Sequence, residues 1–267
     1  MLNVIVCGAA GRMGSTLVRL IHDSRAMKLV GAVESANHPQ IGKDAGEIAG
    51  VGKIGVPIAD RIAPLPKGPV VIIEFTAPEA TLEHVKIAVE KNIAIVVGTT
   101  GLNQKQLDEI KKLSRRTRVL ISANMSLGVN LLVSLMGRVA AILGDDYDVE
   151  IVEAHHRFKK DAPSGTALAL ARPIAAALKR DLDQAGVCGR KGIVGERTKQ
   201  EIGLLSVRAG DIVGEHTVIF GGLGERIEFI HRAQSRETFA RGALRAAQWL
   251  VKQKKGLYSM QDVLGLG

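Results

Sequence analysis

The stretch that decides the fold class is Val4-Ile5-Val6-Cys7-Gly8-Ala9-Ala10-Gly11-Arg12-Met13-Gly14. It joins a short apolar run that starts at Leu2 to a segment with apolar residues at helical spacing up to about His22. A glycine-rich turn between a buried strand and a helix lets the backbone approach a pyrophosphate, and the helix N-terminus supplies N–H groups. The spacing is Gly8-x-x-Gly11-x-x-Gly14, with Ala10 at the second glycine position of the strict dinucleotide fingerprint. Taken alone, the turn is equally consistent with a tight strand-to-helix connection.

An acidic residue downstream favours the dinucleotide site. Glu34 lies 20 residues beyond Gly14, at the end of a second expected strand over 28–33, where a carboxylate reaches the adenosine ribose hydroxyls. The next residue is Ser35, where an arginine would suit a ribose 2′-phosphate. We therefore expect NADH to be preferred, with NADPH as the alternative cofactor. The basic side chains that could compensate for the missing arginine are His38, Lys43 and Arg12.

The rest of the chain predicts two domains. Strands expected over 70–75, 93–97 and 118–122 alternate with helices over 78–91 and 104–115, which is typical of a parallel sheet covered on both faces. Beyond residue 125 we expect a long helix over 127–143, a strand over 147–154, a helix over 167–178, and three extended segments over 202–207, 216–220 and 226–231. Consecutive strands without crossovers favour a mixed or antiparallel sheet. The predicted fold is α/β, with a Rossmann-like dinucleotide-binding domain over 1–126, completed by 238–267, and a second α+β domain with a mixed sheet over 127–237.

Composition excludes several classes of protein. With 46% apolar and 24% charged residues among 267, the chain can bury a core and is not disordered. We find no uninterrupted apolar run of the roughly 18 residues that a membrane span needs, and no secretion signal, so we expect a cytoplasmic protein without membrane contact. The far-separated Cys7 and Cys188 fit free thiols in a reducing compartment. A net charge of +9 attracts anions, but 3% aromatic residues leave little for stacking bases, so we expect no nucleic acid partner.

The densest polar segment is Glu153-Ala154-His155-His156-Arg157-Phe158-Lys159-Lys160-Asp161-Ala162-Pro163-Ser164-Gly165-Thr166-Ala167. Its basic side chains suit an anionic substrate and proton transfer, and the N–H groups of the helix that follows could hold a carboxylate. A solvated basic loop is the alternative interpretation. We expect no metal here, because HExxH is absent and adjacent histidines on a continuing strand face opposite sides.

These motifs resemble the signature of the dihydrodipicolinate reductase family, now called 4-hydroxy-tetrahydrodipicolinate reductase. The segments that carry the resemblance extend through the whole chain: Gly8 to Gly14, Lys43 to Glu47, Phe75 to Pro78, Gly98 to Gly101, Asn124 to Asn130, Glu153 to Ala167 and Arg208 to Thr217. The resemblance implies an NAD(P)H-dependent oxidoreductase of lysine and diaminopimelate biosynthesis. It also implies a small cyclic imine dicarboxylate as substrate, and a second domain that builds a homotetramer.

The resemblance also implies roles for individual residues. His155 would be the proton donor and acceptor, Lys159 a second donor, and His156 would contact a substrate carboxylate together with the Gly165 and Thr166 N–H groups. For both histidines to reach the substrate, the strand must bend at His155-His156. The cofactor-binding set comprises Gly8, Ala9, Ala10, Gly11, Arg12, Met13, Glu34, Gly98, Thr99, Thr100, Ser122, Ala123, Asn124 and Met125. We expect Arg208, Asp211, Glu215 and His216 to be structural or interface residues.

Two other functions stay open at this point. One is a different two-domain NAD(P)-dependent dehydrogenase of amino-acid metabolism, acting for example on aspartate or its semialdehyde. The other is a non-catalytic nucleotide-binding regulator. The basic cluster at 155–160 favours a dicarboxylate substrate but does not by itself decide between these functions.

Overall fold

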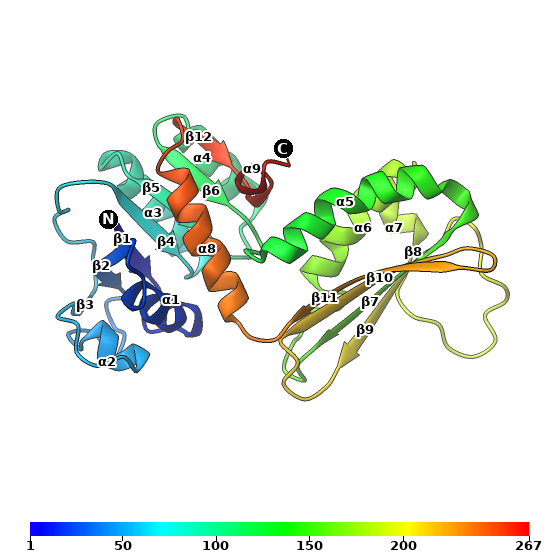
Figure 1. Ribbon diagram of the computed structural model, residues 1–267, viewed down its shortest axis with the longest axis horizontal. Coiled ribbons are helices and arrows are strands. Elements are labelled where there is room, and N and C mark those ends of the chain that lie inside the picture. The colour runs from blue at the N-terminus through cyan, green and yellow to red at the C-terminus, as the bar shows by residue number, and fades with distance from the viewer. Residues whose placement is uncertain (267) are drawn as a thin grey trace. The chain divides into compact units, whose positions relative to one another are not determined.

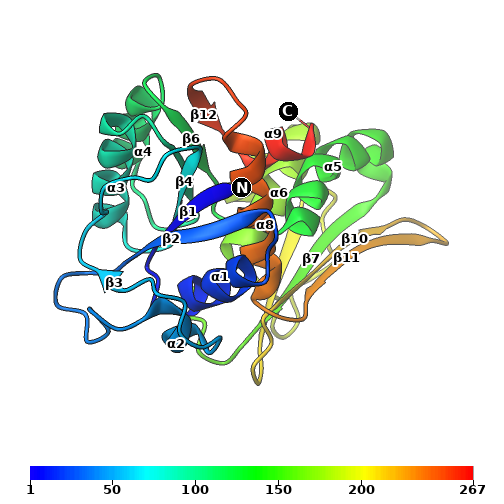
Figure 2. The same cartoon turned by 60° about the vertical axis from the view of Figure 1, so that its left-hand side comes forward.

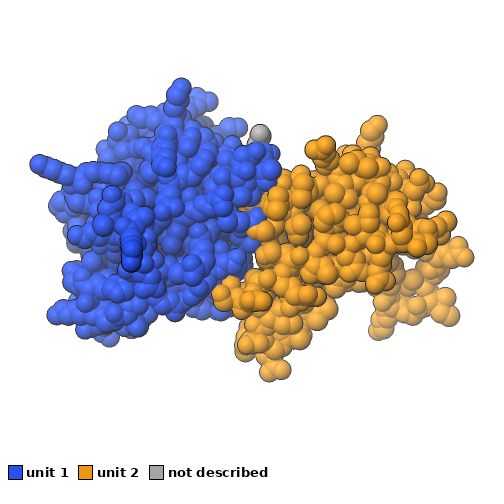
Figure 3. Space-filling view, viewed as in Figure 1, with its two compact units in different colours: residues 1–127, 236–267 blue, residues 128–235 orange. Residues whose placement is uncertain are grey.

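A computed structural model describes residues 1–266 of the chain and divides it into two compact units (Figure 3). Unit 1 contains residues 1–127 and the C-terminal segment that begins at Arg236, and unit 2 contains residues 128–235. Each unit has its own sheet and its own hydrophobic core.

Unit 1 is built on a seven-stranded sheet in which all neighbouring strands run parallel (Figure 1). The strand order is β12-β6-β5-β4-β1-β2-β3. In chain order the strands are β1 (Leu2–Cys7), β2 (Met27–Val33), β3 (Ile58–Ala59), β4 (Val70–Glu74), β5 (Ala94–Val97), β6 (Arg118–Ile121) and β12 (Gly256–Tyr258). Because β4 and β5 are buried on both faces, β5 and the part of β4 before Glu74 are continuous apolar runs.

Helices cover both faces of this sheet, as Figure 2 shows. The helices of unit 1 are α1 (Arg12–His22), α2 (Ala45–Ala49), α3 (Pro78–Glu90), α4 (Gln104–Leu113), α8 (Glu237–Leu250) and α9 (Met260–Leu264). Side chains alternate along each strand, so Val4 and Val6 of β1 join the core under α1 and α8, whereas Ile5 and Cys7 join the core under α3 and α4. The C-terminal α8 thus completes the first unit.

Unit 2 is built on a five-stranded mixed sheet with the order β11-β10-β7-β9-β8. Strands β7 and β9 are parallel, whereas β10 pairs antiparallel with both β7 and β11. The strands are β7 (Asp148–His155), β8 (Gly186–Val187), β9 (Ile202–Arg208), β10 (Gly214–Gly221) and β11 (Arg226–Ala233), and the helices are α5 (Leu127–Leu143), the short 3₁₀ helix η1 (Gly144–Asp146), α6 (Gly165–Ala177) and α7 (Leu182–Ala185). The predicted fold class, a parallel-sheet unit followed by a mixed-sheet unit, is confirmed.

One face of the second sheet changes character along its strands. Val149 and Ile151 of β7 pack with buried residues of α5 and α6, and the next two positions on that face are Glu153 and His155. On β10 the corresponding sequence is Phe220, Val218 and then His216. The apolar core therefore ends in a polar cluster on the same face of the sheet.

The expectation that no segment is apolar enough to span a membrane is wrong by one measure. Residues Leu127–Asp146 form a helical segment of 20 residues with a mean hydropathy of 1.8, long and apolar enough by length and composition alone. Polar residues such as Asn130 and Arg138 interrupt its apolar runs, so a search for an uninterrupted run misses it. A core helix of a soluble protein passes the same test, and Met136 and Ala140 of α5 are buried in the core of unit 2.

Candidate active site

The glycine turn in unit 1 has a geometry that only glycine permits. Gly8 has φ +79°, and a Cβ there would lie 2.3 Å from the carbonyl oxygen of Phe75. A Cβ on Gly14 would lie 2.0 Å from the carbonyl oxygen of Gly8, so the first turn of α1 packs directly against the loop. Gly11 is the N-cap of α1 and has no capping side chain, which leaves this helix N-terminus accessible to an anion.

Glu34 follows β2 and reaches back to this loop. Its Oε1 accepts a hydrogen bond of 2.9 Å from the backbone N–H of Ala10. A cavity of about 280 Å³ opens beside it, and the acidic residues Glu34, Asp60 and Glu83 contribute to its lining, together with Ser35 and His84. The structure thus brings together the loop and the acid that the sequence placed 20 residues apart.

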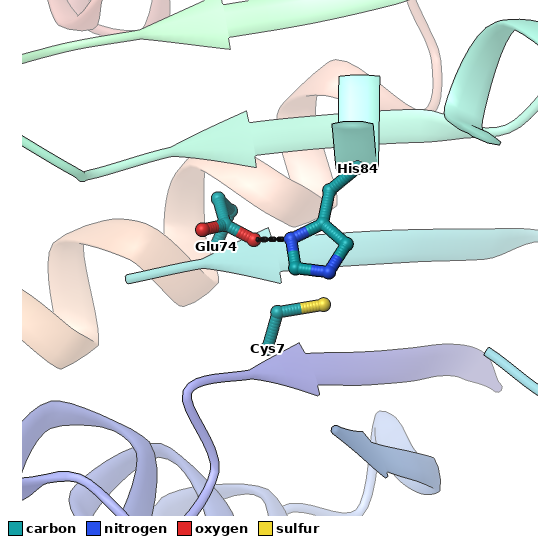
Figure 4. Close-up of side chains that lie close together, drawn as sticks. All are labelled: Cys7, Glu74 and His84. Carbon is teal, nitrogen blue, oxygen red and sulfur yellow. Dashed lines mark hydrogen bonds and ion pairs between the residues drawn. The ribbon is translucent and has the colours of Figure 1, made fainter. Parts of the chain in front are cut away.

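A buried cluster of polar side chains lies at the ends of β1 and β4, and the sequence analysis did not predict it. The Cys7 thiol, the Glu74 carboxylate and a His84 ring nitrogen lie within 4.8 Å of one another (Figure 4). His84 Nδ1 is 2.5 Å from Glu74 Oε2, and the hydroxyls of Thr81 and Thr99 donate to Oε1 at 3.2 and 3.4 Å. Burial, with the Glu74 carboxylate as a second cause, raises the pKa of Cys7, so this thiol stays protonated. These hydrogen bonds account for the cluster, and the absence of a metal stays a prediction.

The other cofactor-binding residues of the sequence analysis lie at the ends of β5 and β6. A Cβ on Gly98 would lie 2.2 Å from the Phe75 ring, and the Thr99 side chain is buried against Glu74. The Ser122 hydroxyl donates to the backbone oxygen of Asn124 at 2.7 Å. Met125 is 1% exposed and belongs to the core, so only its backbone could face a ligand.

The polar cluster of unit 2 is centred on Glu153, which is 1% exposed. Its Oε2 lies 2.6 Å from His155 Nδ1, and Arg208 donates to both of its oxygens, at 2.8 Å to Oε2 and 2.7 Å to Oε1. Oε1 also accepts from the backbone N–H of Ser164 at 3.2 Å. Burial by itself would raise the pKa of Glu153, but the hydrogen bonds from Arg208, Ser206 and His155 outweigh it and lower this pKa to about 2.

The residues around His155 set its charge. Burial lowers the pKa of His155 and Glu153 opposes this, while the nearby Lys159 and Arg208 lower it further. Lys159 Nζ donates to both carboxylate oxygens of Asp161, at 2.8 and 2.9 Å. The imidazole is therefore poised between a carboxylate that favours its charged form and two cations that oppose it.

The N-terminus of α6 forms the third side of the cluster. Ser164 is the N-cap, and its Oγ accepts from the Ala167 N–H at 3.1 Å while lying 3.1 Å from His216 Nε2. Gly165 and Thr166 begin the helix directly after it. Burial, followed by His155 and His231, lowers the pKa of His216 to about 3, so His216 is neutral, and its Nε2 shares a hydrogen bond with the Ser164 hydroxyl.

His156 lies just beyond the end of β7, which stops at His155. Its ring centroid is 6.3 Å from that of Phe158, and its Nδ1 is buried without a hydrogen-bond partner among the described residues. The strand ends where the sequence analysis required a bend.

Sequence reasoning treated Arg208 and His216 as structural or interface residues and gave Glu153 no role, whereas the structure places all three in the cluster. The spacing of Glu153 could have indicated its role, because it lies two residues before His155 and therefore on the same face of the strand.

Comparison with known proteins identifies the family. The N-terminal domain model of dihydrodipicolinate reductase matches residues 2–125, and the C-terminal domain model matches residues 128–264. The chain belongs to the dihydrodipicolinate reductase family. It is 52% identical over 265 residues to the 4-hydroxy-tetrahydrodipicolinate reductase of Syntrophus aciditrophicus (strain SB), covering 99% of each chain. The corresponding enzyme of Syntrophobacter fumaroxidans is 50% identical over 266 residues, covering all of both chains.

Solved structures show the same fold. A dipicolinate-bound dihydrodipicolinate reductase from Paenisporosarcina sp. TG-14 matches with a TM-score of 0.71 and 24% identity, covering 98% of both chains. The expectation of a 4-hydroxy-tetrahydrodipicolinate reductase, an NAD(P)H-dependent oxidoreductase of lysine and diaminopimelate biosynthesis, is confirmed at the level of the family.

Proposed function

We propose that this protein uses the cluster around His155 to protonate its substrate. The substrate is a cyclic imine dicarboxylate, which is reduced to tetrahydrodipicolinate. When bound, the nicotinamide cofactor would supply a hydride to ring carbon C4 of the conjugated imine. The neighbouring ring carbon then takes a proton from the protein. A single observation carries this proposal: an imidazole, an ammonium group and a helix N-terminus gather at the end of β7 in the reductase fold.

His155 is the proton donor in this proposal. Its Nδ1 is engaged by Glu153, so the proton that reaches the substrate is carried by Nε2. Lys159 is the second donor, and its positive charge stabilises the electron-rich enamine that hydride addition creates. Asp161 holds the Lys159 ammonium in place at 2.8 Å.

The substrate carboxylates are bound by the start of α6 and by His156. The N-terminus of α6, at Gly165 and Thr166, has the positive partial charge that a carboxylate needs. The buried Nδ1 of His156 supports a role toward substrate, because it has no hydrogen-bond partner among residues 1–266.

The cofactor is held by Gly8 to Met13, with Glu34 on the adenosine ribose and Gly98 to Thr100 and Ser122 to Met125 near the nicotinamide. The glycine geometry of the loop and the uncapped start of α1 fit a pyrophosphate. NADH is preferred over NADPH, because a 2′-phosphate would meet the carboxylates of Glu34, Asp60 and Glu83 in one cavity. Arg61, which follows Asp60, is paired with it at 2.9 Å.

In this proposal unit 1 is the dinucleotide-binding domain, and unit 2 binds the substrate and forms a cytoplasmic homotetramer. The second sheet supports the subunit contact, because its face away from α5 and α6 carries partly exposed apolar side chains among charged ones. Val207 is 46% and Ile230 45% exposed on that face. Exposed apolar side chains gathered on one sheet face are typical of an interaction site.

The test is cofactor oxidation with substrate freshly made by the preceding synthase, measured with NADH and with NADPH. Substrate-dependent loss of the reduced-nicotinamide absorbance is the expected result, faster with NADH. No oxidation with either cofactor, in protein that binds NADH, would refute the named substrate.

A further inference from the structure

The Glu153 carboxylate is tied to both halves of the proposed reaction site. Oε2 lies 2.6 Å from Nδ1 of His155, the proposed proton donor. Oε1 accepts from the Ser164 N–H at 3.2 Å, and Ser164 is the N-cap of α6, whose first residues are proposed to bind the substrate carboxylate. Arg208 donates to both oxygens and also to the backbone oxygen of Asp161 at 2.7 Å.

We infer that Glu153 is a positioning residue for the reduction: it fixes the His155 ring and the start of α6 relative to one another, and Arg208 fixes Glu153. This inference rests on the proposed role of His155 and deepens it. Glu153 itself does not touch the substrate. Its effect is to hold a proton donor and a carboxylate-binding helix end, two groups that must meet one small ring at the same time.

The hydrogen bond to Nδ1 determines which nitrogen of His155 serves the substrate. With Nδ1–H donated to Glu153, Nε2 is the atom left to carry the transferred proton. Gly214 of β10 packs close to this nitrogen, and an added Cβ there would lie 3.0 Å from Nε2. The ring is therefore oriented by Glu153 on one side and packs against Gly214 on the other.

The titratable and charged side chains around His155 come from its own strand β7, from β9, β10 and β11, and from the segment that follows β7. Glu153 lies on the same strand, Arg208 on β9, His216 on β10 with its ring centroid 5.2 Å away, and Lys159 follows β7. His231 of β11 lies beyond His216 at 6.5 Å between centroids. Among these groups Glu153 is the one anion that contacts the imidazole, so it is the group that sustains the protonated donor.

An ion pair that only stabilises the fold would not require hydrogen bonds to His155 and to the start of α6. Glu150 lies three residues earlier on the same strand and pairs with Arg190 at 2.9 Å and Arg197 at 3.0 Å, with no contact to His155. Glu153 has the additional bonds to His155 and Ser164. Glu150 therefore provides a control from the same strand, in which an arginine pair is broken away from the reaction site.

The experiment compares Glu153→Gln, Glu153→Asp and Glu150→Gln in the full-length enzyme by steady-state kinetics over pH. Removing a residue that orients a functional side chain costs about 10–100-fold, so Glu153→Gln should lower kcat by about that factor with KM for NADH unchanged. The active donor is protonated His155, so activity falls as pH rises through the His155 pKa. Because the carboxylate raises that pKa, Glu153→Gln should move this fall to lower pH.

Glu153→Asp keeps the charge but is shorter by one methylene, so kcat should fall while the pH at which activity is lost changes little. This variant retains a partner for Arg208 and covers the case in which Glu153→Gln does not fold. Glu150→Gln should leave kcat and the pH profile as in the wild type.

Two outcomes would overturn the inference. One is a Glu153→Gln enzyme with wild-type kcat and an unmoved pH profile; the other is an equal loss in Glu150→Gln. His155→Gln separates this failure from that of the proposed function. Wild-type turnover in His155→Gln refutes the proton-donor role itself, whereas a large loss there with an unaffected Glu153→Gln refutes only the positioning role.

Discussion

Glu34 Oε1 accepts a hydrogen bond of 2.9 Å from the backbone N–H of Ala10, so the acid at the end of β2 is bound to the glycine loop. The same carboxylate lines a cavity with Asp60 and Glu83. One side chain thus supports the loop and adds to the negative charge of the cavity in which we place the adenosine ribose.

Glu34→Gln should shift cofactor preference toward NADPH. The amide can still accept from Ala10, but one negative charge is removed from the cavity, which should lower the kcat/KM ratio of NADH to NADPH roughly tenfold. Steady-state kinetics with both cofactors measure this ratio. Glu90→Gln, on the exposed end of α3, is the control, and an unchanged ratio in Glu34→Gln would contradict the proposed ribose site.

Gly14→Ala should abolish tight NADH binding. Its Cβ would lie 2.0 Å from the Gly8 carbonyl oxygen, so α1 and the loop must separate. Calorimetric titration with NADH checks this, with Gly221→Ala as the control because nothing lies within 4 Å of a Cβ there. Undiminished affinity in Gly14→Ala would show that the loop does not hold the cofactor.

Lys159→Met should lower kcat more than it raises the KM for NADH, because its charge is proposed to act on the reacting ring in unit 2. General acid–base groups typically contribute about 10²–10⁴-fold, and a supporting cation should lie at or below the lower end of this range. The neighbouring Lys160 is exposed, and Lys160→Met is the matched control. Equal kcat values for the two variants would argue against a role of Lys159 in proton transfer.

His216 should make the folded protein less stable in acid. Its pKa is lowered to about 3 in the folded state, mainly by burial, from an ordinary value of 6.5. Between these values the unfolded chain binds the extra proton, so the contribution of His216 is complete above pH 6.5 and is lost as pH falls toward 3, by up to ~1.4 kcal/mol per pH unit.

Denaturant unfolding of the wild type and His216→Gln at several pH values measures this slope. The glutamine can accept the Ser164 hydroxyl hydrogen, so the variant should show a shallower loss of unfolding free energy over that range. Parallel curves for the two proteins would mean that His216 does not titrate as described.

Local patterns in the sequence were enough to predict the parallel sheet of unit 1 and the mixed sheet of unit 2. The alternation from Leu2 to Ile121 predicts β1, β2, β4, β5 and β6 because each element has its own hydrophobic period, whereas the two-residue β3 was not predicted. The strand β12 and the helix α9 were missed because they are short, and β12 is defined by its pairing with β6 rather than by its own residues. Pairing across the sheet is not visible in a local window.

The same limit applies to the polar cluster. The motif from Glu153 to Ala167 is contiguous, so its histidines and lysines could be singled out from the sequence. Arg208 and His216 join it only because β9 and β10 flank β7 and place them opposite His155 and Glu153. Their roles depend on strand register, and the sequence contains no local signal for register.

The change from apolar to polar along one face of β7 has a consequence for how this enzyme can vary. Val149, Ile151, Glu153 and His155 share that face because they are spaced by two, so a one-residue insertion early in β7 would turn all four to the opposite side together. In this strand, core packing and the placement of the site residues therefore depend on the same register. Substitutions can alter either property, but length changes should fall outside β7 and outside the site segment 156–164 that follows it.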